Sequence, residues 1–230
     1  MSIPKIIHYC WFGGNTKSKK IEKCIESWKE KLPDYEIIEW NEERININNY
    51  KFAKRAMKYK QYAFVADYIR TYVLYTYGGI YLDTDQEILK NIDHILENNA
   101  FIGMEDDDHL SCGIIGVNKN AQWLKNILDR YDKIKFNPYD LDSMLIPKIY
   151  TDEIINQGLK FSNDKVYYND TITIYPSEYF YPIDFKSGEK NITENTIAIH
   201  HWDGSWKKNK KISYWFKVKA KIYYSLGINI

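Results

Sequence analysis

The chain has 230 residues, 44% hydrophobic and 16% aromatic, so it is long enough to bury one core and too apolar for disorder. Its 32 basic and 31 acidic residues leave a formal net charge of +1, which excludes the strongly basic surface of a general nucleic-acid binder. It has three cysteines without a Cys-x-x-Cys pair, and it lacks a leader-like segment and a membrane-length apolar run. These features predict a cytoplasmic protein with reduced thiols.

The N-terminal part of the chain predicts one strand–helix–strand unit. Residues 3–12 form an apolar strand that ends at Gly13-Gly14. Residues 17–31 have apolar side chains at helical spacing and charged residues elsewhere, and residues 35–40 follow as a second strand. This order is typical of a parallel α/β sheet.

Two helices and a short strand come next. Residues 50–60 predict a short basic helix, and residues 62–77 predict a longer one. Gly78-Gly79 predicts the end of this helix, because glycine readily adopts the left-handed conformation that terminates helices. Residues 80–82 then form a short apolar strand.

The second half of the chain predicts further alternation of helices and strands, without repeats or a low-complexity linker. The expected elements are a strand at 113–117, a helix at 121–131, a helix at 139–158 broken near Pro147, a strand or hairpin at 166–175 and a strand at 197–199.

The sequence Asp83-Thr84-Asp85 is the clearest candidate for chemistry. Residues two apart in extended chain face the same side, so both carboxylates converge at the end of an apolar strand. Two such carboxylates repel each other unless a cation lies beside them, and their hard oxygen atoms suit Mg²⁺ or Mn²⁺. Acidic pairs are common in loops, but the strand and the glycine pair before this one favour a metal site.

Asp67 and Arg70 lie on one face of the helix that leads into this strand. One interpretation is a surface ion pair that contributes little to stability. The other is a site shared with Asp83 and Asp85, and the spacing alone favours neither.

The segment 200–206, HHWDGSW, is the second candidate. Two successive histidines after a strand point to opposite faces, so one of them could complete a metal site begun by Asp85. An isolated histidine is more often an ordinary core or surface residue. Lys207 and Lys208 follow, where a diphosphate needs cationic partners.

Two further segments allow both a functional and a structural interpretation. Trp11, at the end of the first strand, could stack on a nucleobase or belong to the core. The acidic run 105–108 could line the side of the site where an acceptor binds, although a solvated loop is the favoured interpretation.

Together these motifs resemble the family-32 glycosyltransferases, which include capsular-polysaccharide enzymes and the fungal initiating mannosyltransferases. The resemblance is carried by three ordered stretches, IPKIIHYCWFGG at 3–14, ADYIRTYVLYTYGGIYLDTD at 66–85 and IHHWDGSW at 199–206. The glucosyltransferase domain of the large clostridial toxins is similar more distantly.

The resemblance implies an α/β fold of the GT-A type with a mixed sheet over residues 1–206. It implies a metal-dependent, retaining transferase that uses Mn²⁺ or Mg²⁺ and a nucleotide-sugar donor, with UDP favoured by analogy. The implied acceptor is a glycan or a lipid-linked saccharide in surface or capsular polysaccharide synthesis.

The same resemblance assigns residues to roles. The donor's nucleotide and sugar would contact His8, Trp11, Tyr81, Asp83, Ser205, Trp206 and Lys207. The catalytic set would be Asp67, Arg70, Asp83 and Asp85, and the metal ligands would be Asp85, His201 and Asp83. His201 is chosen because His201, Gly204 and Lys207 also match the His-x-x-Gly…Lys pattern of retaining family-8 transferases.

Other interpretations stay open. A phosphatase with an aspartate nucleophile shares the DxD tripeptide but places it near the N-terminus, and an inactive nucleotide-sugar or glycan-binding module would keep the same motifs. Residues 207–230 form a basic, aromatic tail that predicts either a helix packed on the domain or peripheral contact with the inner face of an anionic membrane.

Overall fold

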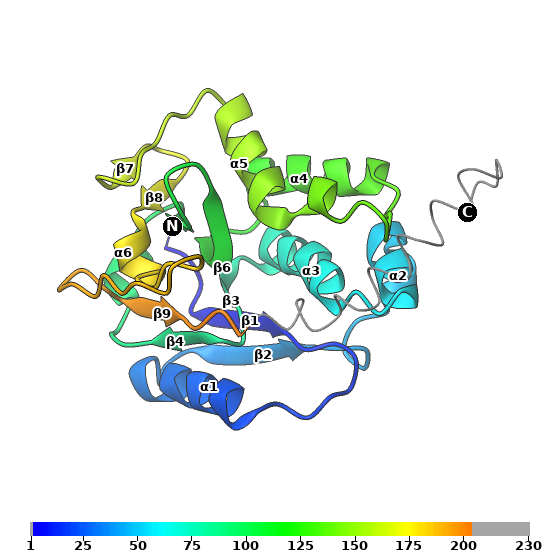
Figure 1. Ribbon diagram of the computed structural model, residues 1–230, viewed down its shortest axis with the longest axis horizontal. Coiled ribbons are helices and arrows are strands. Elements are labelled where there is room, and N and C mark those ends of the chain that lie inside the picture. The colour runs from blue at the N-terminus through cyan, green and yellow to red at the C-terminus, as the bar shows by residue number, and fades with distance from the viewer. Residues whose placement is uncertain (1, 204–230) are drawn as a thin grey trace.

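A seven-stranded sheet runs through the centre of the protein in the computed structural model, which describes residues 2–203 (Figure 1). The strand order is β2-β1-β3-β6-β5-β8-β7. The strands are β1 (Ile6–Cys10), β2 (Glu36–Trp40), β3 (Gly79–Leu82), β5 (Ala100–Met104), β6 (Leu110–Val117), β7 (Tyr167–Tyr168) and β8 (Thr173–Tyr175). A separate two-stranded sheet pairs β4 (Gln86–Ile88) with β9 (Ala198–His200).

The sheet is mixed, as expected for the GT-A type. β1 pairs in parallel with β2 and with β3, which confirms the predicted strand–helix–strand unit. β6 is antiparallel to β3 and to β5, whereas β5 and β8 are parallel. The carboxyl ends of β1, β2, β3, β5 and β8 therefore lie at one edge of the sheet, where ligands bind in folds of this class.

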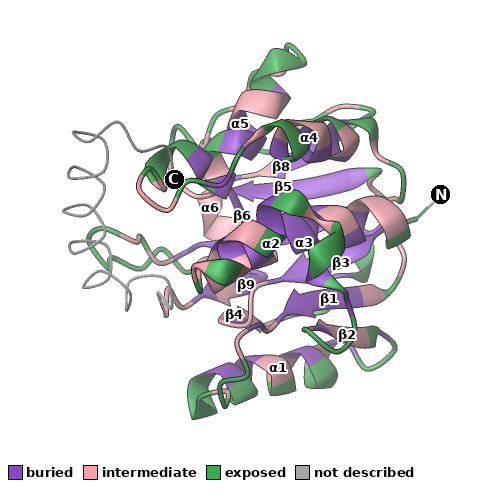
Figure 2. Cartoon of the chain, turned by 90° about the vertical axis from the view of Figure 1, so that its right-hand side faces the viewer, coloured by how far each residue is buried: buried purple, intermediate pink, exposed green. Residues whose placement is uncertain are grey.

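Helices cover both faces of the sheet. One face carries α2 (Lys51–Lys58), α3 (Tyr62–Tyr77), α4 (Gln122–Lys133) and α5 (Ile146–Asn156), and the other carries α1 (Lys19–Lys31) and α6 (Ser177–Phe180). Figure 2 shows buried residues concentrated in the central strands and exposed ones on the outer faces of the helices. Among the described helices, none is both long and apolar enough to cross a membrane.

Two local features connect the sequence to the fold. Gly78 and Gly79 both have positive φ (68° and 95°), and a Cβ on either would lie within 2.7 Å of a backbone atom. Only glycine fits there, so the predicted end of α3 is confirmed. Pro147 lies in the first turn of α5, where its missing N–H costs no helical hydrogen bond. The helix expected over 139–158 is interrupted near Pro147, as predicted: a 3-10 turn at Asp142–Met144 ends at Leu145 and α5 begins at Ile146, one residue before the proline.

Candidate active site

A tight turn after β3 presents the DxD carboxylates at the carboxyl edge of the sheet. The N–H of Asp83 donates to the carbonyl of Gly113 on β6 (2.7 Å), and the N–H of Gln86 closes the turn on the carbonyl of Asp83 (2.9 Å). The chain then enters β4, which pairs Gln86 with His200 on β9. This register carries a histidine 115 residues further along the chain to the side of Asp85.

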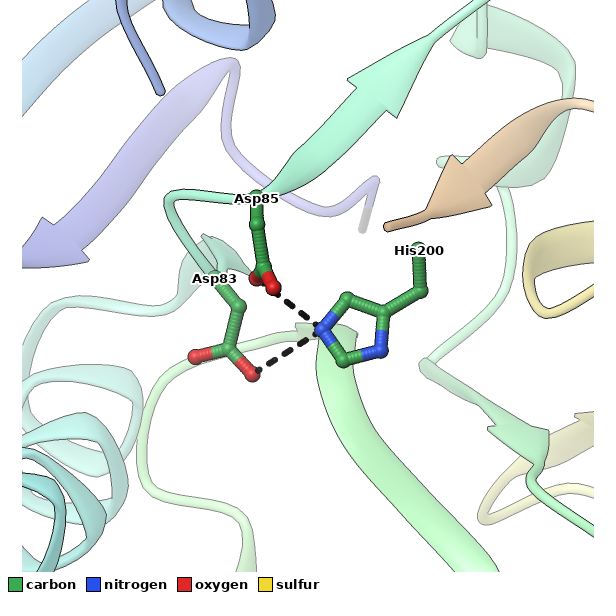
Figure 3. Close-up of side chains that lie close together, drawn as sticks. All are labelled: Asp83, Asp85 and His200. Atoms are coloured by element: carbon green, nitrogen blue, oxygen red, sulfur yellow. Dashed lines mark hydrogen bonds and ion pairs between the residues drawn. The ribbon is translucent and has the colours of Figure 1, made fainter. Parts of the chain in front are cut away.

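Asp83, Asp85 and His200 point toward one another and could hold one metal ion (Figure 3). His200 Nε2 lies 3.0 Å from Asp85 Oδ1 and 3.9 Å from Asp83 Oδ2. One potential ligand atom from each residue lies within 4.8 Å of the others. The second oxygen of Asp85 accepts the backbone N–H of Asp203 at 2.7 Å. β9 therefore supplies the histidine, and the segment that follows β9 holds Asp85 in place.

The structure places His200, not His201, beside the two aspartates. Side chains alternate along β9, so Ala198 and His200 are buried, whereas Ile199 between them and His201 after them are only partly buried. The imidazole of His201 pairs with Glu87 at 2.6 Å. Its backbone N–H donates to the carbonyl of Asp85. The assignment of His201 as a metal ligand is corrected on this geometry, because the motif was aligned one residue out of phase.

The charges of the three side chains are coupled. Burial opposes the charged form of His200, but the carboxylate of Asp85 and then that of Asp83 outweigh burial and raise the pKa of His200. Burial also opposes ionisation of Asp85, whereas His200 and the N–H of Asp203 hold the pKa of Asp85 well below its usual range. Both shifts favour an ion pair between Asp85 and His200, and a histidine that ligates a metal has to be neutral.

The residues present fit a divalent cation. Two carboxylates and one imidazole are ligands that Mn²⁺ accepts. Beside them, a Cβ on Gly113 would meet Asp83 Oδ2, Gln86 Oε1 and the Tyr181 hydroxyl, each at 3.3 Å. Gln86 Oε1 is buried and has no hydrogen-bond partner among the described residues. The space left by the missing side chain of Gly113 and the unpaired Oε1 of Gln86 therefore both lie beside the candidate metal site.

Arg70 forms a buried ion pair with the site, not a surface one. Its Nη2 lies 2.8 Å from Asp83 Oδ1 and 3.4 Å from Asp67 Oδ1, and its Nη1 donates to the carbonyl of Cys112. Only 5% of Arg70 and 8% of Asp67 are exposed, so the surface interpretation of this pair is wrong. Burial raises the pKa of Asp67 to about 7 although Arg70 opposes the shift. Arg70 thus joins α3 to the turn after β3.

Two of the predicted donor contacts lie in the core instead. Tyr81 is 1% exposed, and the Arg70 guanidinium lies over its ring at 4.2 Å from the centroid. His8 is fully buried, with Nε2 on the carbonyl of Gly78 (2.9 Å) and Nδ1 accepting the indole N–H of Trp40 (3.1 Å). Because a carbonyl only accepts and an indole only donates, His8 is the neutral Nε2–H tautomer. The assignments of His8 and Tyr81 as donor contacts are therefore corrected.

Trp11 lies at the same sheet edge, beside a cavity of about 720 Å³. Gly13, Asn41 and Tyr62 line this cavity, together with the carboxylate residue Glu39. The indole N–H of Trp11 donates to the carbonyl of Asn15 at 2.6 Å. The tryptophan is thus placed at the rim of a cavity and is not enclosed in the core.

Three predicted contacts, Ser205, Trp206 and Lys207, lie outside the described residues, as does the tail 207–230. One residue near the site was not assigned to it from the sequence. Glu105, expected in a solvated loop, is half-buried just after β5. Burial raises the pKa of Glu105, and the nearby His200 opposes this rise. The sequence pattern did not predict β5 at 100–104. Had it done so, Glu105 would have been expected beside Asp83, because β5 ends at the same sheet edge as β3.

Comparison with known proteins agrees with this geometry. Residues 18–102 match the family described as glycosyltransferase sugar-binding region containing DXD motif. The matched part of the chain thus resembles a DXD glycosyltransferase sugar-binding region. This region includes Asp67, Arg70, Asp83 and Asp85, whereas Glu105 and His200 lie beyond it.

Two yeast mannosyltransferases are among the proteins that this chain is similar to. Inositol phosphoceramide mannosyltransferase 3 of Schizosaccharomyces pombe is 29% identical over 59% of the chain and 39% of its own length. Mannosyl phosphorylinositol ceramide synthase SUR1 of Saccharomyces cerevisiae is 32% identical over 60% of the chain and 37% of its own length. The chain therefore spans less than half the length of these curated relatives.

The fold agrees with a solved glycosyltransferase. The PaToxG glycosyltransferase superposes with a TM-score of 0.52 at 19% identity, over 68% of this chain and 70% of that structure. At this identity the match confirms the GT-A-type fold.

Proposed function

We propose that this chain is a metal-dependent glycosyltransferase that moves a hexose from a nucleotide-sugar donor to a hydroxyl group of a glycan or lipid-linked acceptor. The observation that carries the proposal is the convergence of Asp83, Asp85 and His200 at the carboxyl edge of the sheet. The matched DXD region supports the same activity. The names of the yeast relatives favour mannose as the hexose and a lipid headgroup as the acceptor.

The reaction separates a sugar from a diphosphate, so negative charge develops on the leaving group. A divalent cation, when bound by Asp83, Asp85 and His200, supplies the positive charge that stabilises it. The two oxygens of Asp83 have different partners: Oδ1 accepts a hydrogen bond from Arg70, and Oδ2 faces His200 and the proposed metal position. Arg70 and Asp67 therefore fix the orientation of Asp83 from α3, and the same pair is the proposed contact for the donor sugar.

The nucleotide is proposed to lie along the same edge, with its base at the cavity beside Trp11. Glu39, Glu42 and Glu43 line this cavity, and their carboxylates accept hydrogen bonds from the N–H groups of a base. Guanine and uracil both present such groups. UDP-linked and GDP-linked hexoses therefore both belong in the first test. Retention of configuration and a place in surface-polysaccharide synthesis, both implied by the resemblance, stay predictions.

A donor screen tests the proposal. The protein is incubated with UDP- and GDP-linked hexoses, with Mn²⁺ or with EDTA, and the release of free nucleotide is measured. Metal-dependent release from one donor is expected. Asp85→Asn should reduce it by about 10²–10³. Asp129→Asn, which removes one carboxylate from a surface ion pair of α4, is the matched control.

Two results would count against transferase activity. Calorimetric binding of a donor without any turnover, even with candidate acceptors present, would favour the inactive binding module. The absence of both nucleotide release and donor binding, with every donor tested, would overturn the proposed function altogether.

A further inference from the structure

A second group of residues adjoins the metal ligands on the side of β5. Glu105 follows β5 directly, and β5 runs in the same direction as β3 because both are antiparallel to β6. Asp83 and Glu105 therefore emerge at one sheet edge on opposite sides of β6. A register shift between Ile102 and Gly103 interrupts the β5–β6 ladder just before Glu105. Such irregularities redirect the side chains that follow them, and they are frequent beside active sites.

The carboxylate of Glu105 has no partner within residues 2–203. Its backbone N–H donates to the carbonyl of His109, but no hydrogen bond or ion pair engages its side chain in that part of the chain. Burial is the largest of the influences that raise its pKa, followed by the carboxylate of Asp106, while His200 opposes the shift. A half-buried carboxylate that makes no hydrogen bond or ion pair within this part of the protein is free to accept hydrogen bonds from a ligand.

Aromatic side chains border the same place. The ring centroids of Trp202 and His200 are 4.1 Å apart, and those of Trp202 and Phe185 are 5.1 Å apart. The segment that carries Phe185 returns toward Glu105, because Lys186 Nζ lies 3.3 Å from Asp106 Oδ2. A series of contacts thus connects His200 to Trp202, Trp202 to Phe185, and the neighbouring Lys186 to Asp106, the residue next to Glu105.

Trp202 is held in an unusual conformation at this point. Its φ of 50° lies in the left-handed region, which is costly for a bulky side chain. The indole N–H donates to the carbonyl of Ile183 at 2.7 Å, and the residue stays partly exposed. The left-handed backbone turns the chain at Trp202, and the contacts with Ile183, His200 and Phe185 hold the indole there.

The chemistry of this group selects a class of ligand. Carboxylates accept hydrogen bonds from hydroxyl groups, and an aromatic face covers the apolar C–H face of a saturated ring. The neighbouring Asp106 and Glu105 carboxylates would repel a phosphate placed directly on them. A neutral six-membered ring with several hydroxyl groups meets both conditions.

We propose that Glu105 and Trp202 form the acceptor subsite and bind a polyhydroxylated ring, with the Glu105 carboxylate accepting a hydrogen bond from one of its hydroxyl groups. This inference rests on the proposed function, because it places the acceptor beside the donor's metal site. The ring can be the headgroup of a lipid or the end of a glycan, and both present the same hydroxyl chemistry.

The first experiment compares transfer with hydrolysis in Glu105→Gln. Transfer is measured to myo-inositol, to methyl α-mannoside and to vesicles that contain phosphatidylinositol, while release of nucleotide to water is measured without acceptor. We expect the ratio of transfer to hydrolysis to fall about tenfold or more, mainly through a higher acceptor KM, since hydrogen bonds to a charged group are among the stronger ones. Preference for the vesicles over the soluble rings would identify a lipid headgroup.

Asp108→Asn is the matched control, because it removes an exposed carboxylate three residues away in the same loop. An unchanged ratio in Glu105→Gln would overturn the proposal. So would an equal loss of hydrolysis and transfer, because that result would place Glu105 on the donor side.

A binding measurement tests the subsite without relying on transferase activity. Saturation-transfer NMR with myo-inositol and methyl α-mannoside should show binding to the metal-free protein, weakened in Glu105→Gln and in Trp202→Ala. Circular dichroism and the urea midpoint show whether each variant is folded. If neither ring binds the folded wild-type protein, the subsite is wrong even where the donor screen succeeds. If rings bind but no donor is turned over, the proposed function fails and the subsite stands.

Discussion

Replacing Arg70 by lysine tests the central claim about the site, that one guanidinium holds α3 and the DxD turn together. Arg70 reaches Asp83 (2.8 Å), Asp67 (3.4 Å) and the carbonyl of Cys112, and it also lies over the ring of Tyr81. A lysine keeps the positive charge but has one compact ammonium group. It can satisfy one of the two carboxylates and cannot reproduce the planar contact with the ring.

The expected cost follows from these losses. At least one charge-assisted hydrogen bond disappears, which is worth about 1.5–3 kcal/mol. The buried contact between cation and ring contributes about 1–2 kcal/mol more. We therefore expect Arg70→Lys to lower the free energy of unfolding by about 3 kcal/mol, close to the range for disrupting a buried ion pair.

Urea unfolding, followed by tryptophan fluorescence in the absence of metal, measures this change. Arg130→Lys is the control, because Arg130 pairs with Asp152 at 3.0 Å with both side chains at least 36% exposed. That substitution should change the unfolding free energy by about 0.5 kcal/mol or less. If Arg70→Lys costs no more than Arg130→Lys, the guanidinium does not organise the site and the reasoning is refuted.

Two further predictions concern the pH dependence of stability and the space at the metal site. Burial lowers the pKa of His8 from 6.5 to about 4, so the unfolded chain takes up a proton first and stability falls as pH drops below 6.5. Relative to His8→Gln, the wild type should lose about 2 kcal/mol of unfolding free energy between pH 7.5 and 5, and a constant difference would contradict the neutral buried histidine. Gly113→Ala places a methyl group 3.3 Å from Asp83 Oδ2 and should weaken Mn²⁺ binding about tenfold, as measured by calorimetry. An unchanged affinity would show that this space does not serve the metal.

Local patterns in the sequence were enough to place much of the site. Helical spacing put Asp67 and Arg70 on one face, and strand alternation put Asp83 and Asp85 on one side. Their depth was not predictable, since burial of the ion pair depends on β6 packing beside β3. The Ala100–Met104 strand was missed because its short apolar run has no polar–apolar alternation, although Asn98-Asn99 before it and the acidic run after it are residues that bound strands.

The histidine pair shows where a motif alone fails. Alignment with related motifs favoured His201, but the identity of the ligand depends on the phase of a three-residue strand against β4. The small Ala198, two residues before His200, was the available signal for the inward phase. His8 was misassigned for a similar reason, because its two hydrogen-bond partners lie 32 and 70 residues away in sequence.

The pairing of β4 with β9 also has a consequence for biosynthesis. Asp85 leaves the ribosome 115 residues before His200, which corresponds to about 6–23 s at ordinary rates of translation. During that interval the nascent chain has only two of the three candidate metal ligands. Once the set is complete, a bound ion stabilises the folded state by mass action. An ion at the proposed site would have all three ligands only after β9 has docked, and its affinity would then report whether this late segment has reached its place.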